Sequence, residues 1–151
     1  MFISVYPEAM KVSTKGRYGL LLMIELAHQF GRGPVLVGTI AERHELPAKY
    51  LHVLMGSLKA AGLVKVLRGP SGGCELARHP SRITALDVLE SLEGSLEQGV
   101  VGAGSGAGTR VVGLLLAQSS EAFRVVLARW SLADLAEKQH SLEAGSDGYS
   151  I

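Results

Sequence analysis

The chain has 151 residues, of which 47% are hydrophobic and 19% charged, so it is long enough to bury the core of one domain. Its formal net charge of +1 conceals a division: residues 10–82 hold 11 basic and 4 acidic side chains, whereas residues 83–151 hold 4 and 9. The single cysteine excludes a disulfide framework and a four-cysteine zinc site, and we find no apolar run of the roughly 18 residues that a membrane span needs. We expect a soluble, cytoplasmic protein whose basic first half either binds a polyanion or is an ordinary solvated face.

Residues 1–9 have no helical or strand periodicity and contain Pro7, and a regular pattern begins at Met10. The segment lacks the basic start and long apolar run of a signal peptide, so we expect an extra or disordered N-terminal segment. After it, Ser13 or Thr14 is expected to cap a buried first helix that ends at the following glycines.

A short second helix is expected over residues 37–44, followed by a tight turn at residues 45–46. Pro47 then opens a third helix, where its missing N–H costs nothing. Apolar residues recur in this helix at three- and four-residue spacing, and Gly62 is a plausible residue to end it.

Two short runs, residues 63–67 and 74–77, then change the period and flank a glycine-rich tip, as in a β-hairpin. Helix, short helix, turn, helix and hairpin is the order of a winged helix-turn-helix. We therefore predict a mainly α fold with one small hairpin, and a winged helix-turn-helix domain over residues 10–82.

The second half begins with a connecting helix, expected over residues 83–98 because Thr84 and Asp87 have the spacing of a capping box. Residues 99–110 are glycine-rich, and each glycine loses much backbone entropy when it is ordered. This composition predicts a flexible loop.

Two further helices are expected within residues 111–140, a long one to about Arg129 and a shorter one capped by Ser131 and Asp134. Residues 141–151 read as a polar tail that frays.

In a winged helix-turn-helix, the second helix of the motif enters the major groove with its N-terminal end first. There, Lys49 can donate to guanine or phosphate, Tyr50 can donate to phosphate, and His52 faces outward toward bases. Alternatively, Tyr50 packs in the core and His52 is an ordinary surface residue. Arg68 lies on a loop with few side chains that could enter a minor groove, and the loop lacks the ending of a nucleotide-binding motif.

Several segments together resemble the Rrf2 family of bacterial regulators, which includes an iron–sulfur sensor, a regulator of cysteine metabolism and a nitric-oxide sensor. These segments are MKVSTKGRY at residues 10–18, IAER at 40–43, Tyr50-Leu51, residues 58–64, and RGPSGG at 68–73. The resemblance implies a repressor that binds double-stranded DNA at a partly palindromic operator, as a homodimer built on the long helix. The DNA-binding candidates it implies are Lys15, Arg17, Ala48, Lys49, Tyr50, His52, Arg68, Gly69, Pro70, Ser71, Gly72 and Gly73.

The chain departs from the family at the cluster site. Cluster-binding members carry three cysteines in the loop before the dimerisation helix, where this chain has Gly, Ala, Ser and Val. Because cluster irons need thiolate or imidazole ligands, we expect no [2Fe–2S] cluster there and no other cofactor. Cys74, where the family often has an aromatic residue, is either a redox thiol on the wing or a small strand residue facing the packed side.

We find no paired carboxylates, nucleophile–base constellation or cofactor fingerprint, so an enzyme is not expected. The alternative function is a regulator that senses an effector or binds a regulatory protein through its acidic second half or glycine-rich loop. In that case DNA binding is vestigial or controlled by the partner. No membrane partner is expected.

Overall fold

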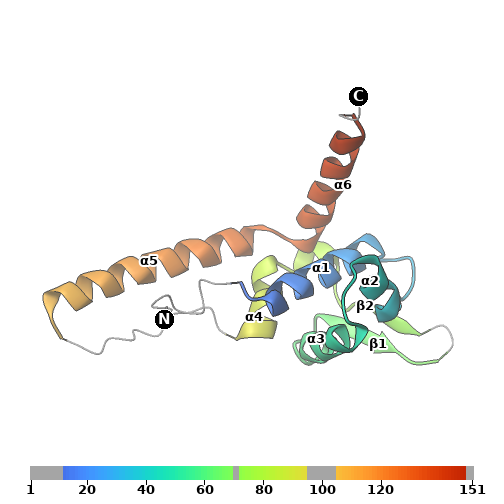
Figure 1. Ribbon diagram of the computed structural model, residues 1–151, viewed down its shortest axis with the longest axis horizontal. Coiled ribbons are helices and arrows are strands. Elements are labelled where there is room, and N and C mark those ends of the chain that lie inside the picture. Colours follow the sequence, from blue (N-terminus) through green and yellow to red (C-terminus); the bar gives the residue numbers. More distant parts are fainter. Residues whose placement is uncertain (1–11, 70–71, 95–104, 149–151) are drawn as a thin grey trace.

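Four helices and a hairpin form the body of the molecule, from which a long helix extends as an arm (Figure 1). The computed structural model describes residues 12–69, 72–94 and 105–148. Its elements are α1 (Thr14–His28), α2 (Val37–Arg43), α3 (Ala48–Ala60), β1 (Val64–Leu67), β2 (Gly73–Leu76), η2 (Pro80–Arg82), α4 (Ala85–Glu93), α5 (Ala107–Arg129) and α6 (Leu132–Gly148). The predicted fold, mainly α with a two-stranded antiparallel hairpin in the winged-helix order, is confirmed.

The core lies between α1, the helix-turn-helix, the hairpin and α4. Its fully buried side chains include Leu22 and Met23 of α1 and Leu51, Leu54 and Leu58 of α3. Strand β1 pairs with β2, and β2 also forms a bridge through Cys74 to Val35, which precedes α2. The hairpin is thereby attached to both ends of the helix-turn-helix.

Helix α1 also packs closely against α4. Gly16 and Gly19 face that helix, and a Cβ at Gly19 would overlap the side chain of Leu92. At the start of α1, the Ser13 hydroxyl accepts from Gly16 N–H, while the Ser13 N–H donates to Glu93 Oε1 at 2.9 Å. Of the two caps expected, Ser13 and Thr14, the structure has Ser13, which also connects α1 to the end of α4.

One buried carboxylate joins α1 to the helix-turn-helix. Glu25 lies in the middle of α1, within a mostly apolar stretch, with only 8% of its side chain exposed. Arg43 Nη1 donates to its Oε2, and His44 Nε2 lies 3.0 Å from its Oε1. Because both partners come from the end of α2, this network holds α2 against α1 and limits how α3 can be oriented.

Two capping boxes lie side by side where the chain returns to the body. Thr84 and Asp87 cap α4, and Ser131 and Asp134 cap α6, each with reciprocal hydrogen bonds of 2.9–3.1 Å, as the sequence predicted. A bridge between Thr84 and Ser131 joins them, and Leu132 next to it is fully buried. This contact anchors the base of α6.

Both C-terminal helices are longer than the sequence predicted. Helix α5 begins at Ala107, so residues 107–110 are its first turn and not loop; Arg110 N–H donates to the carbonyl of Gly106 at 3.1 Å. Helix α6 continues through part of the expected frayed tail, supported by a hydrogen bond from Gln139 to Glu143. The connecting helix expected over residues 83–98 is α4, which ends at Glu93 with Gly94 as its cap. The expectations for residues 1–9, 95–104 and 149–151 lie outside the described residues.

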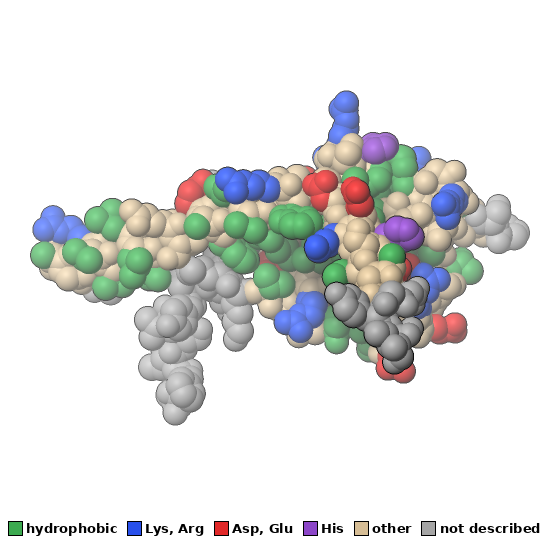
Figure 2. Space-filling view, turned by 90° about the horizontal axis from the view of Figure 1, so that it is seen from above, with side chains coloured by type: hydrophobic (Ala, Val, Ile, Leu, Met, Phe, Trp, Pro, Cys, Tyr) green, Lys and Arg blue, Asp and Glu red, His purple; other side chains and the backbone are tan. Residues whose placement is uncertain are grey.

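Helix α5 carries most of its apolar side chains on the surface (Figure 2). By length and composition alone it is apolar enough to cross a membrane, with a mean hydropathy of 1.5 over 18 residues of which 6% are buried. The expectation from the sequence concerned an uninterrupted apolar run, and the chain has none of that length. The mean hydropathy is an average over 18 residues, so it stays high although two charged residues interrupt the run. Core helices of soluble proteins pass the same test, so the observation is weak evidence for a membrane.

The Glu25 network generates a prediction about stability. Arg43→Ala leaves the buried Glu25 carboxylate with His44 alone and should lower the free energy of unfolding by about 1–3 kcal/mol. Arg17→Ala, which removes an exposed guanidinium from the same helix as Glu25, is the control and should change it by less than roughly 0.5 kcal/mol. Urea unfolding of the three proteins measures this, and equal midpoints would show that the network contributes no stability.

Candidate nucleic-acid interface

Burial of one face of α3 determines which of its side chains reach solvent. Leu51, Leu54, Met55 and Leu58 are buried against the body. On the opposite face Lys49, Val53, Gly56 and Ala60 are exposed, and their spacing of four, three and four residues places them on one line along the helix. This line, which we call the reading line, is the surface that α3 can offer to a groove of DNA.

The candidates at the start of α3 differ in exposure. Ala48, Lys49 and His52 are exposed, with His52 beside the reading line. Tyr50 is half-buried and packs edge to face on Tyr18, with ring centroids 5.8 Å apart. Its ring therefore packs against the core, as the alternative interpretation of Tyr50 expected. Lys15 and Arg17 are exposed in the first turns of α1. Contact of any of them with DNA stays a prediction.

A left-handed residue sets the angle between α2 and α3. Glu45 has φ 54°, a conformation that costs a residue with a side chain about 1–2 kcal/mol. The Leu46 N–H donates to the carbonyl of Ala41 at 2.8 Å and closes the turn. The expected tight turn is therefore present.

The hairpin tip, or wing, places Arg68 in solvent next to residues that must be glycine. Gly69 has φ 103°, and Gly72 N–H donates to its carbonyl at 2.9 Å. A Cβ at Gly72 would lie 2.8 Å from that same carbonyl oxygen, and one at Gly73 2.6 Å from the carbonyl oxygen of Val35. Gly69, Gly72 and Gly73 therefore add no side chains next to Arg68. Pro70 and Ser71 lie outside the described residues.

Cys74 lies on the packed side of β2. Only 1% of it is exposed, and its Sγ donates to the carbonyl of Val35 at 3.2 Å. Burial raises the pKa of the thiol to about 11, so little thiolate exists at neutral pH. Cys74 is thus placed as a small strand residue that faces the packed side of the hairpin, the second of the two interpretations given above. A redox role for its thiol stays a prediction.

Sequence reasoning missed three residues of the reading line, Val53, Gly56 and Ala60. The signal was present, because Lys49 was already a candidate and positions four, seven and eleven residues later share its face of the helix. Valine, glycine and alanine, however, have no side-chain hydrogen-bonding group and so were not recognised.

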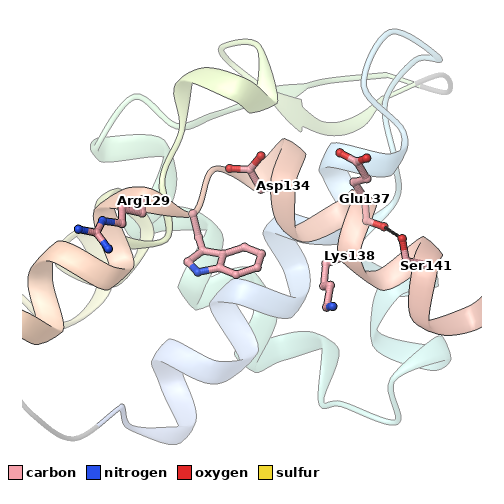
Figure 3. A pocket seen from close by; sticks show the side chains of 6 residues that line it. Arg129, Asp134, Glu137, Lys138 and Ser141 are labelled. Atoms are coloured by element: carbon pink, nitrogen blue, oxygen red, sulfur yellow. Dashed lines mark hydrogen bonds between the residues drawn. The ribbon is translucent and has the colours of Figure 1, made fainter.

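A shallow pocket of about 440 Å³ lies at the corner between α5 and α6, lined by Arg129, Trp130, Asp134, Glu137, Lys138 and Ser141 (Figure 3). Its charged groups do not converge: Arg129 points away from Lys138, and Glu137 and Lys138 point to opposite sides of α6. The carboxylate of Asp134 already caps α6. Among the described residues, no three His, Cys, Asp or Glu side chains are grouped to hold a metal ion.

The raised pKa of Cys74 generates a prediction about alkaline stability. The protonated thiol favours the folded state, and this contribution is complete below about pH 9 and is lost progressively between about pH 9 and pH 11, because the unfolded thiol ionises first. The wild type should lose up to about 1.4 kcal/mol per pH unit relative to Cys74→Ala. Urea unfolding of both proteins at about pH 8 and about pH 10 measures the difference. Parallel pH profiles would show that the thiol ionises equally in both states.

Comparison with known proteins places the fold and this interface in one family. Residues 12–138 match the model of the Rrf2 family, described as an iron-dependent transcriptional regulator. The chain is 49% identical over 87 residues to the HTH-type transcriptional regulator CymR of Bacillus subtilis, a stretch that covers 58% of this chain and 63%, less than two thirds, of that relative. It is 32% identical over 138 residues to IscR of Xenorhabdus nematophila, covering 89% of this chain and 84% of the relative.

The solved structure of CymR, the global cysteine regulator of B. subtilis, superposes with a TM-score of 0.77 and 41% identity, over 85% of this chain and 97% of that one. The match in sequence thus extends to the arrangement of the helices and the wing. The chain belongs to the Rrf2 family of winged-helix transcriptional regulators.

Proposed function

We propose that this chain is a sequence-specific DNA-binding repressor that binds a partly palindromic operator as a homodimer, in the cytoplasm of a bacterium. The observation that carries the proposal is the exposed reading line of α3, a helix that lies next to the hairpin in the body (Figure 1). This is the arrangement in which a helix enters a major groove while a wing follows the backbone or the adjacent minor groove.

The distribution of charge supports a polyanion as the partner. Every basic residue that the structure describes between residues 12 and 82 is exposed. Of these, Arg43 and Lys65 are paired with carboxylates, whereas Lys49 and Arg68 stand on the proposed contact surface. Contacts of such side chains with phosphates release condensed counterions, which gives affinity that falls steeply with salt.

The exposed apolar face of α5 supports a homodimer. Val111, Leu114 and Leu115 are each more than 60% exposed on a helix that extends beyond the body. A second copy of α5 presents the same apolar surface, so a two-fold axis would bury both. The same axis would place two copies of α3 at related half-sites, which is why we propose a partly palindromic operator.

The donor set does not fit the iron that the family description implies. The sequence contains no cysteine or histidine between His79 and His140, which includes the whole connection from α4 to α5. The one cysteine is buried in the hairpin and hydrogen-bonded to Val35. Since a [2Fe–2S] cluster needs thiolate or imidazole ligands, we propose regulation without a cluster at that site.

Selection of bound duplexes from a random pool, with reductant and separately with oxidant, tests the proposed function. A two-fold symmetric site in both conditions supports the repressor, and enrichment only with reductant would make Cys74 part of the control. If neither condition enriches a sequence, and binding to DNA does not depend on salt, the proposal is wrong and the regulator works through a protein partner or effector.

The wing generates a prediction about salt dependence. Arg68→Ala should weaken operator binding on the order of tenfold and reduce the slope of log K against log salt by about one per protomer. Arg129→Ala, which removes an exposed arginine at the end of α5 that adjoins α6, is the control and should leave both values unchanged. Titrations at several salt concentrations measure the slopes; identical slopes for Arg68→Ala and wild type would remove the wing from the interface.

The α5 arm generates a prediction about assembly. Leu115→Asp places a charge in the proposed apolar contact, and we expect a monomer at concentrations where the wild type is a dimer. Leu142→Asp on α6 is the matched control, because both leucines are 61% exposed. Sedimentation equilibrium distinguishes the two masses, and a dimeric Leu115→Asp would contradict the role of α5.

A further inference from the structure

We infer that Val53 is a specificity-determining residue that contacts the C5-methyl group of a thymine in the major groove of the operator. The inference rests on the proposed DNA binding by α3. It concerns a side chain that cannot form hydrogen bonds and whose contribution therefore has to come from apolar contact.

Val53 occupies the centre of the reading line. It lies one turn after Lys49, which is at the end of α3 that would enter the groove first, and one turn before Gly56. Its side chain is 64% exposed, although the core-facing side chains of the same helix are at most 4% exposed. Val53 is therefore not part of the core cluster of the described residues, and its side chain is available to a molecule that contacts this face of α3.

The rest of the reading line allows a close approach. A Cβ at Gly56 would have nothing within 4 Å, so the glycine is not required by packing inside the protein. Ala60 follows on the same line with only a methyl group. Because no long side chain stands behind Val53 on this line, the helix backbone can come near the base edges, and a short isopropyl group can reach them.

The chemistry of the groove selects the partner. The edges of G, C and A offer hydrogen-bond donors and acceptors in the major groove, and thymine alone adds a methyl group. If Val53 packed on a polar base edge, it would displace water from that edge without replacing the hydrogen bonds that the water made. If it packs on the thymine methyl group, both the valine and the methyl group bury apolar surface. Lys49, one turn earlier on the reading line, and His52, beside that line, would supply the hydrogen bonds that fix the register.

Deoxyuridine in place of thymine removes this methyl group and keeps every hydrogen-bonding atom. In the operator recovered by selection, deoxyuridine is substituted at each thymine in turn, at the symmetric positions of both half-sites. At one position we expect a loss of affinity of about fourfold for one half-site and about fifteenfold for both, from the burial of one methyl group each.

Two variants assign the methyl contact to Val53. Val53→Ala should bind the thymine and deoxyuridine operators with equal affinity, and its fold is preserved because the site is exposed and alanine favours helix. Val53→Thr keeps one methyl group and should retain part of the penalty. His52→Ala, the neighbouring exposed residue, is the control: it should weaken binding or change preference at another base pair while keeping the full deoxyuridine penalty.

The outcomes separate this inference from the proposed function. If selection yields no operator, the proposed function fails before Val53 is tested. If an operator is recovered but no thymine is sensitive to deoxyuridine, or the penalty persists in Val53→Ala, the helix reads DNA without this contact and the inference is wrong. A penalty that disappears in Val53→Ala and persists in His52→Ala supports it.

Discussion

The burial of one face of α3 is the constraint on which the rest of the structure depends. Four side chains of this helix pack on α1, α4 and β1, and they leave Lys49, Val53 and Gly56 on the opposite side. The orientation of that face is then set by contacts outside α3. The Glu25 network holds α2 to α1, and the left-handed Glu45 turns the chain from α2 into α3. A charged residue inside an apolar helix therefore has a structural role in presenting a surface.

The two halves of the chain differ in charge and in the kind of surface that they expose. The basic half forms the body with its exposed reading line and wing, where positive charge favours a polyanion. The second half is acidic overall, but its long helix α5 is apolar on its surface, which suits contact with a second protein surface. The packing of α4 and α6 on α1 brings the two halves together. The bridged capping boxes of α4 and α6 then fix the position on the body from which the arm starts.

The wing and the connection between α4 and α5 differ in what their residues allow. The wing glycines have a stereochemical reason, since Cβ atoms at Gly72 and Gly73 would meet backbone oxygens. By contrast, the connection between α4 and α5 carries no thiolate or imidazole ligand. The remaining cysteine fills the packed side of the hairpin, where burial raises its pKa and suppresses the reactive thiolate. These two observations are the basis of the proposal that regulation does not use a cluster at that site.

Local patterns in the sequence determined the order of the elements and several of their ends. The caps at Ser13, Thr84 and Ser131, the end of α3 at Gly62 and the hairpin around residues 68–72 follow from side chains and backbone preferences within a few residues of each position. Only the tertiary structure decided the partners of Glu25, the half-burial of Tyr50 on Tyr18, and the inward direction of Cys74. These depend on residues distant in the chain, such as Arg43 for Glu25 and Val35 for Cys74, which periodicity within one element does not encode. Val53 is a different case, because helical spacing within α3 already places it on the face of Lys49; it was missed because a valine side chain has no hydrogen-bonding group.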